Sequence, residues 1–283
     1  MSNGRIKTGI LGLDEMLGGG FLPNSANLIE GAPGTGKTTV ALQFIYNGIV
    51  DYNENGLIIS FEEFPTQYYH DAANFGWDLK KLERRSGERS PTIGHVAERR
   101  LKILFSSPSI ILEEIREPGS ELIRTIEELN IKRVVIDSVT HFESIAKNSA
   151  EARDVERQLV NGFKREGVTT VFIRENDSIL GQSATVVRSS DSAIAAGSSK
   201  MPFIVDSYML LRYVEIDSEI QKALIVLKMR GSDHQKDIRR YRCTQNGIEV
   251  ESKFTGREGI MSGNPRARPQ DAFVDVFKKA RKA

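Results

Sequence analysis

A complete phosphate-binding loop lies near the N-terminus of this chain. Residues 31–38 read Gly-Ala-Pro-Gly-Thr-Gly-Lys-Thr, which matches the pattern G-x-x-x-x-G-K-[ST] at every fixed position. The residues before it, 26–30, form a strand-like run, and residues 39–50 carry apolar side chains at a helical spacing. A strand, this loop and a helix in that order predict a P-loop α/β fold and a bound nucleoside triphosphate.

Each residue type in the loop suits phosphate. The glycines at 31, 34 and 36 let backbone N–H groups turn inward, because glycine reaches conformations that a Cβ atom would block. The following helix adds the positive end of its dipole, the lysine reaches the β and γ oxygens, and the next hydroxyl can ligate Mg²⁺. The expected nucleotide contacts are Gly34, Thr35, Gly36, Lys37, Thr38 and Thr39, with Thr38 also a metal ligand.

Composition limits the remaining function classes. The 283 residues suffice for one large α/β domain with a tail, or for two small domains. With 39 Lys and Arg against 38 Asp and Glu, the chain has no global basic field of the kind that binds nucleic acid non-specifically. The single cysteine, Cys243, excludes an intramolecular disulfide and a cysteine-based zinc site. Without an apolar stretch of membrane-spanning length or a secretion signal, we expect a soluble, cytoplasmic protein that does not enter the membrane.

Strand-like and helix-like segments alternate through the first two thirds of the chain. The pattern predicts a mostly parallel sheet with helices on both faces, which binds ligands at the carboxyl ends of its strands. The expected strands are 26–30, 56–61, 101–105, 133–137 and 169–174, and the expected helices are 37–50, 65–75, 109–129 and 150–166.

The pattern changes after about residue 200. Residues 203–215, 221–230, 238–243 and 247–250 are expected to be antiparallel strands that complete the same sheet. Two segments, 84–102 and 188–200, are expected to be loops. We expect one domain over residues 1–255 and a basic tail over residues 256–283, with a short amphipathic helix at 271–282.

An acid follows the apolar strand predicted at 133–137. The carboxylate of Asp137 would emerge at the carboxyl edge of the sheet, beside the phosphate-binding loop. An acid after a strand is commonly a helix cap or a solvated charge, but beside a triphosphate it can hold Mg²⁺ through water. We therefore predict that Asp137 is a metal ligand.

Two further acids, Glu62 and Glu63, end the predicted second strand at the same edge. Their charges repel the phosphates, so a role in orienting and deprotonating the attacking water is favoured. Alternation along the strand would send the two side chains to opposite faces, so that one acts directly and the other supports it. The alternative is a pair of solvated acids at a helix start.

Lys228 and Arg230 lie two residues apart on a predicted strand. Both would point to one face, while Leu227 and Met229 point into the core. Two cations on one rigid face suit a γ-phosphate, and we expect that phosphate to belong to a neighbouring subunit. A solvated strand face is the alternative.

With these residues the chain resembles the KaiC family of RecA-type ATPases over nearly its whole length. The matching motifs are Thr8 to Asp14, the phosphate-binding loop, Phe61-Glu62-Glu63, Phe75 to Asp78, Ile136 to Thr140, and Lys228 to Ser232 followed by His234. The resemblance implies a RecA fold, a homo-oligomeric ring that is usually a hexamer, ATP bound at subunit interfaces, and hydrolysis with Mg²⁺. Residues 210–216 and 259–265 resemble the C-terminal half of double-domain members more than the N-terminal half.

The resemblance also implies roles for individual residues. Glu62 and Glu63 become the catalytic acid pair, with Lys37 also acting on the phosphates. Lys228 and Arg230 become contacts from one subunit to the γ-phosphate held by its neighbour. Further contacts to the neighbour's nucleotide are implied for Lys222, Ser232 and His234.

The resemblance also bears on self-phosphorylation, because in the double-domain clock members a Ser-Thr pair shortly before the strand at residue 206 receives phosphate from ATP. Aligned on Val205-Asp206, the positions of that pair fall on Pro202 and Phe203, which have no hydroxyl, while Ser198 and Ser199 are out of register. The favoured function is therefore an oligomeric Mg²⁺-dependent ATPase whose slow hydrolysis acts as a signalling or assembly switch on an unidentified protein partner. The alternatives are a Ser/Thr autokinase, a DNA-handling ATPase that uses the basic loop and tail, and a nucleotide-gated scaffold.

Overall fold

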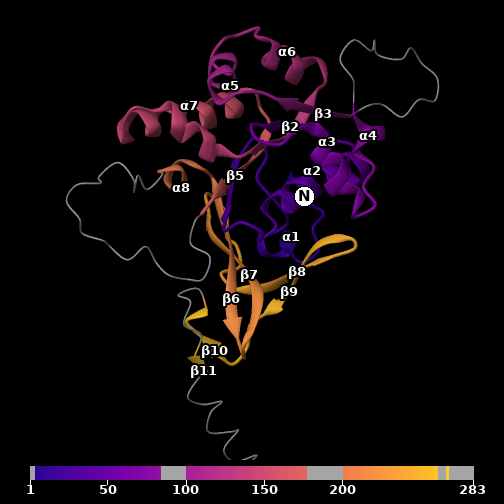
Figure 1. Cartoon of the computed structure of the whole chain (residues 1–283), viewed down its shortest axis with the longest axis vertical. Helices are drawn as coiled ribbons and strands as arrows, with labels where there is room; N and C mark the ends of the chain where they lie inside the picture. Colours follow the sequence, from indigo (N-terminus) through magenta and orange to yellow (C-terminus); the bar gives the residue numbers. More distant parts are fainter. Residues whose placement is uncertain (1–3, 84–99, 177–199, 261–265, 268–283) are drawn as a thin grey trace, which may run out of the picture.

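A nine-stranded sheet organises the computed structural model, which describes residues 4–83, 100–176, 200–260 and 266–267 (Figure 1). The strand order is β3-β2-β4-β5-β1-β6-β7-β8-β9; pairings from β3 to β6 are parallel and those from β6 to β9 are antiparallel. The strands are β1 (Ala26–Gly31), β2 (Asn55–Ser60), β3 (Leu101–Phe105), β4 (Ile131–Asp137), β5 (Thr169–Glu175), β6 (Ser207–Ile216), β7 (Glu219–Met229), β8 (Arg239–Thr244) and β9 (Gly247–Lys253).

Helices cover both faces of the parallel strands, because alternate residues of buried strands face opposite layers. Along β1, Leu28 packs in one apolar cluster and Ile29 in the other. The layer around Ile29 holds α1 (Leu13–Met16), α2 (Lys37–Tyr52), α3 (Pro65–Ala73) and α4 (Leu79–Leu82). The layer around Leu28 holds α5 (Pro108–Glu114), α6 (Glu121–Glu128), the 3₁₀ helix η1 (Val139–Ile145), α7 (Ser149–Arg165) and α8 (Met201–Ile204), and Figure 1 shows α5, α6 and α7 grouped together.

These layers confirm the expected α/β architecture, but three expectations about the bounds or direction of its elements were wrong. The predicted helix 109–129 is two helices, because Pro118 lacks an N–H group, Gly119 turns the chain at φ 77° and Ser120 caps α6. The predicted strand 203–215 begins only at Ser207, because Pro202 starts the short helix α8. That strand, β6, is parallel to β1 and not antiparallel. The chain between β5 and β6 is long enough for the crossover connection that a parallel strand needs.

A β-bulge corrects the expected orientation of the side chains at the end of β7. The register with β6 shifts between Tyr208, opposite Lys228, and Met209, opposite Val226. Leu227 is the extra residue, and it is 48% exposed, whereas Met229 is buried. Leu227 therefore does not point into the core as the alternation predicted.

A buried arginine fixes α2 against β4. The Arg133 side chain is fully buried; it donates to Glu54 Oε2 at 2.6 Å and to the carbonyl of Phe44 at 2.9 Å. Gly48 of α2 allows this approach, because a Cβ there would lie 2.4 Å from the Arg133 side chain. The contact sets the helix that follows the phosphate-binding loop beside the strand that ends in Asp137.

Parts of the predicted loops and tail fall outside the described residues. These are 84–99 of the first loop, 188–199 of the second, and the tail helix 271–282. Within the tail range, β10 (Arg257–Glu258) and β11 (Arg266–Ala267) pair antiparallel. In the part of the chain that the structure describes, every helix is too short or too polar to cross a membrane.

Candidate nucleotide-binding site

The phosphate-binding loop joins β1 to α2 at the carboxyl edge of the sheet. Gly34 and Gly36 have φ values of 74° and 94°, a region that glycine enters without steric cost. Gly31 is required for a different reason. A Cβ at this position would lie 2.7 Å from the carbonyl oxygen of Leu211 on β6 and 2.7 Å from Thr35 Oγ1. The first glycine of the loop therefore allows the close approach of β6 and of the Thr35 side chain.

Replacing Gly31 by alanine should destabilise the protein. The neighbouring atom is a backbone carbonyl held in the sheet, so the strand must shift, and we expect the free energy of unfolding to fall by about 1–3 kcal/mol. Urea unfolding measures this change. Gly4→Ala is the control, because nothing lies within 4 Å of a Cβ there. Equal stabilities of the two variants would contradict the close approach of β6.

The ammonium of Lys37 lies within the curve of the loop. The residue is buried, and Nζ donates to the carbonyl of Ala32 at 3.0 Å, which also accepts from Thr35 Oγ1 at 2.7 Å. Burial lowers the pKa of Lys37, while the charges of Glu175 and Asp137 act in the opposite direction. A cation held at this position can bind the oxygens of a triphosphate.

The antiparallel strands support the loop from the other side. The Tyr241 hydroxyl on β8 donates to the carbonyl of Thr35 at 2.5 Å, and Lys222 Nζ on β7 donates to the carbonyl of Gly34 at 2.9 Å, above the ring of Tyr213. Lys222, which the family pattern relates to a neighbour's nucleotide, thus contacts the loop of its own chain. These contacts explain why strands far downstream in the sequence belong to the site.

Asp137 at the end of β4 faces the start of α2. Its Oδ2 accepts from Thr38 Oγ1 at 3.0 Å and from the hydroxyl of Tyr68 at 3.1 Å. Burial raises the pKa of Asp137, whereas these two hydrogen bonds and the Lys37 charge lower it. A carboxylate and a hydroxyl side by side are the hard oxygen ligands that Mg²⁺ prefers, so this donor set fits the metal. Thr39 follows on the first turn of α2.

The two acids after β2 lie in a bend and not on the strand, so the expected alternation does not apply to them. Glu63 is largely exposed. Partial desolvation and, as smaller causes, the negative charges of Asp137, Asp71 and Glu62 raise the pKa of its carboxyl group. Glu62 is 70% exposed and lies 3.5 Å from His141 Nε2 on η1. Both acids therefore stand at the same edge as Asp137, with different partners.

Sequence reasoning missed two groups at this edge. Glu175 ends β5, one residue beyond the predicted strand, and its charge acts on both Lys37 and Asp137. The same signal that identified Asp137, an acid after an apolar strand, also marks Glu175. Tyr68 had no such signal, because an aromatic residue on an amphipathic helix is ordinarily part of the core.

Lys228 and Arg230 lie at the opposite edge of the sheet from the phosphate-binding loop. Lys228 Nζ donates to the carbonyls of Pro202 at 2.9 Å, Phe203 at 3.3 Å and Val205 at 2.7 Å, at the carboxyl end of α8. Arg230 Nη2 donates to the carbonyl of Phe203 at 3.3 Å. Burial and the charge of Arg230 lower the pKa of Lys228. Proline and phenylalanine at 202 and 203 thus contribute backbone acceptors here.

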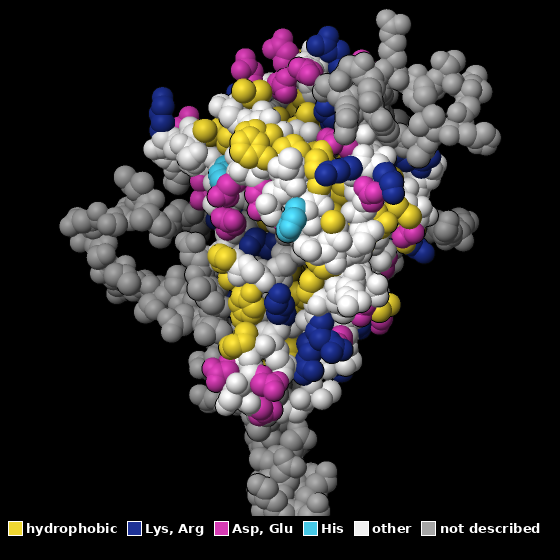
Figure 2. Space-filling model, turned by 45° about the vertical axis from the view of Figure 1, so that its right-hand side comes forward, with side chains coloured by type: hydrophobic (Ala, Val, Ile, Leu, Met, Phe, Trp, Pro, Cys, Tyr) yellow, Lys and Arg dark blue, Asp and Glu magenta, His cyan; other side chains and the backbone are white. Residues whose placement is uncertain are grey.

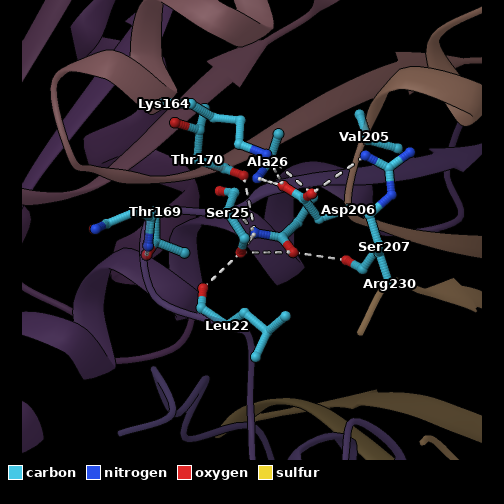
Figure 3. A network of polar contacts seen from close by, with 12 residues as sticks. Leu22, Ser25, Ala26, Lys164, Thr169, Thr170, Val205, Asp206, Ser207 and Arg230 are labelled. Atoms are coloured by element: carbon cyan, nitrogen blue, oxygen red, sulfur yellow. Dashed lines mark hydrogen bonds and ion pairs between the residues drawn. The ribbon is translucent and has the colours of Figure 1, made fainter. Parts of the chain in front are cut away.

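A buried acid organises this second cluster (Figure 3). Asp206 Oδ2 accepts from Lys164 Nζ at 2.8 Å and from the N–H of Ala26 at 2.9 Å, and its Oδ1 lies 3.9 Å from Arg230 Nη1. Ala26 is the first residue of β1, whereas the loop begins at the last one, Gly31. Lys222, beside the loop, and Lys228 are six residues apart on β7, which corresponds to about 20 Å at the usual rise of a strand.

Ser232 and His234 follow β7. Ser232 Oγ hydrogen-bonds the guanidinium of Arg5 and donates to the carbonyl of Asp233 at 2.9 Å. The backbone N–H of His234 donates to Asp233 Oδ1 at 2.9 Å, and the next residue, Gln235, donates its N–H to Met16 on α1. The structure thus brings these two residues beside the N-terminal segment.

Comparison with known proteins agrees with this geometry. A family model described as "ATPase: KaiC" matches residues 6–254. "Circadian clock oscillator protein KaiC" of Thermostichus vulcanus is 34% identical over 283 residues, covering 99% of this chain and 49% of the relative. The protein of the same name from Nostoc sp. is also 34% identical, over 287 residues, with 99% and 49% covered.

A third relative has a similar relation to the chain. "Circadian clock oscillator protein KaiC 1" of Synechocystis sp. is 33% identical over 270 residues, covering 93% of this chain and 46% of the relative. The chain spans about half the length of the curated relatives it matches. The RecA-like α/β fold expected from the sequence is confirmed, and the chain belongs to the KaiC family of ATPases.

Proposed function

We propose that this chain is an oligomeric, Mg²⁺-dependent ATPase whose active site is completed by a neighbouring copy. The observation that carries the proposal is the separation of the two sets of phosphate-binding groups. Lys37 and Thr38 lie at one edge of the sheet, and Lys228 and Arg230 at the other. Cations about 20 Å along a strand from the loop can reach a γ-phosphate only if it is held by another subunit.

Within one subunit, the loop edge supplies the remaining groups. Lys37 binds the β and γ oxygens, the loop from Gly34 to Thr39 holds the phosphates, and Thr38 and Asp137 hold Mg²⁺, which neutralises charge on the phosphates when bound. Glu63 is the better candidate for the general base, because partial desolvation and the negative charges of nearby acids raise the pKa of its carboxyl group, which makes it the stronger base. Glu62, paired with His141, supports it.

Exposed apolar side chains at both edges support a head-to-tail assembly. At the loop edge, the ring centroids of Phe64 and Phe105 lie 4.5 Å apart, and the two side chains are 62% and 45% exposed. At the other edge, Phe203 is 71% exposed and Leu227 48%. Figure 2 shows apolar side chains gathered on the surface of the visible face beside acidic ones. Two different patches of this kind suit a heterologous interface that closes into a ring, for which we propose a hexamer.

We further propose that hydrolysis is slow and serves as a switch. The relatives are named as circadian clock oscillator proteins, and this chain matches about half of each. We propose a signalling or assembly role with a protein partner in the cytoplasm, which that likeness supports. Water is the favoured acceptor of the γ-phosphate, because the positions that would carry the phosphorylated pair are Pro202 and Phe203.

The test is a phosphate-release assay with ATP, read together with the intact mass of the protein. We expect steady release of phosphate in Mg²⁺, loss of release in excess EDTA, and no added phosphate mass on the chain. Release in Mg²⁺ with a stoichiometric gain of phosphate mass would instead indicate an autokinase. Nucleotide binding with no release would leave only a scaffold and contradict the proposal.

A further inference from the structure

The hydroxyl of Tyr68 is directed at the carboxylate of the candidate metal site. The side chain is 1% exposed and its hydroxyl lies 3.1 Å from Asp137 Oδ2. The phenol O–H is the donor in this hydrogen bond, because a carboxylate oxygen can only accept. The ring packs in the apolar cluster of α2 and α3, which holds the hydroxyl in place.

Two hydroxyls thus share one carboxylate oxygen. Thr38 Oγ1 donates to Asp137 Oδ2 at 3.0 Å, and Tyr68 donates to the same atom. Among the described residues, the side-chain hydrogen bonds to this carboxylate end on Oδ2, so Oδ1 remains for the metal ion or its water. Thr38 can keep its hydrogen bond while its own oxygen ligates Mg²⁺, because a hydroxyl has one donor and two acceptor lone pairs.

Tyr68 also connects Asp137, the candidate metal ligand, to the segment that carries Glu62 and Glu63. Tyr68 lies on α3, which begins at Pro65, two residues after Glu63. Ser60 Oγ donates to the carbonyl of Glu63 at 2.7 Å and accepts from its N–H at 3.2 Å, which fixes the bend. The phenol therefore ties the helix that follows this bend to the end of β4.

We propose that Tyr68 is a positioning residue for the metal ion: its hydroxyl orients the Asp137 carboxylate so that one oxygen faces the Mg²⁺ of a bound nucleotide. Groups that orient a metal ligand commonly change metal affinity by about 10-fold to 100-fold. The inference rests on the proposed ATPase function. It adds a residue of this chain that the P-loop pattern does not contain.

The test is the substitution Tyr68→Phe, which removes the hydroxyl and keeps the ring in the core. Mn²⁺ serves as the probe, and its binding to the protein–ADP complex is measured by electron paramagnetic resonance. We expect Tyr68→Phe to weaken Mn²⁺ binding about 10-fold. The affinity for ADP in EDTA should stay within about twofold of the original protein, since the phenol hydrogen-bonds Asp137 and, among the described residues, no hydrogen bond joins it to the phosphate-binding loop.

Tyr69→Phe is the matched control. It removes the neighbouring hydroxyl on the same helix, which hydrogen-bonds Glu83, and it should leave Mn²⁺ binding unchanged. Unaltered Mn²⁺ affinity in Tyr68→Phe, or equal losses of Mn²⁺ and EDTA-resistant ADP binding, would overturn the inference while leaving the proposed function standing. Failure of the original protein to bind ADP at all would overturn both.

Discussion

Replacement of Lys37 by alanine is expected to lower ATP hydrolysis by a factor on the order of 10² to 10³. The ammonium is buried within the loop, and in the proposed site its loss would remove a charge-assisted hydrogen bond to the phosphates. We expect nucleotide affinity to fall on the order of 10- to 100-fold as well, because hydrogen bonds to charged groups contribute about 1.5–3 kcal/mol. Phosphate release and calorimetric titration with ADP measure the two effects.

Lys132→Ala is the control for that experiment. Lys132 is exposed on β4, so its removal deletes the same charge and leaves the loop intact. Thermal unfolding of both variants checks that the fold persists. A Lys37→Ala protein that binds and hydrolyses ATP as well as Lys132→Ala would contradict the assignment of the loop as the nucleotide site.

Replacement of Arg230 by alanine is expected to separate binding from hydrolysis. Because Arg230 lies at the edge opposite the loop, ATP binding by a subunit should stay nearly unchanged. Hydrolysis should fall by a factor on the order of 10³, as when an arginine that stabilises the transferred phosphate is removed. Equilibrium binding of ATP and the steady-state rate of ATP hydrolysis, measured on the same preparation, test this expectation.

Mixing two inactive variants tests whether Arg230 acts across an interface. Glu63→Gln removes the candidate base at the loop edge, and Arg230→Ala removes the cation at the other edge. In a random equimolar assembly about a quarter of the interfaces combine an intact loop edge with an intact Arg230. Activity should therefore return on mixing. A mixture as inactive as either variant alone would place both residues in one subunit's site and contradict the proposal.

The sequence predicted the local part of the site because that part follows from short-range patterns. The loop from Gly31 to Thr38 and the acid after an apolar strand, Asp137, each lie where a strand meets the carboxyl edge. Five parallel strands were placed within two residues of their observed bounds, because buried strands of this kind read as continuous apolar runs. The KaiC family pattern then assigned roles to residues on and after the downstream strands, and those roles stay predictions.

The sequence could not show features that depend on one extra residue or on tertiary contact. The bulge at Leu227 changes which side chains reach the core, and apolar alternation carries no mark of it. Strand β2 ends at Ser60, and the bend after it places Glu62 and Glu63 outside the strand. The apolar pattern does not mark this bend either. Tyr68 and Tyr241 contact the site through chain segments far apart in the sequence, so only the fold shows their proximity to Asp137 and Thr35.

The most direct test of a site shared between subunits is the rate of hydrolysis per subunit as a function of protein concentration. Phosphate release in Mg²⁺ and ATP is measured over a dilution series, and the molecular mass is measured at the same concentrations. We expect the rate per subunit to rise in step with the assembled fraction and to approach zero where the chain is monomeric. Full turnover by monomers would show that Lys228 and Arg230 are not needed from a neighbour and would contradict the account.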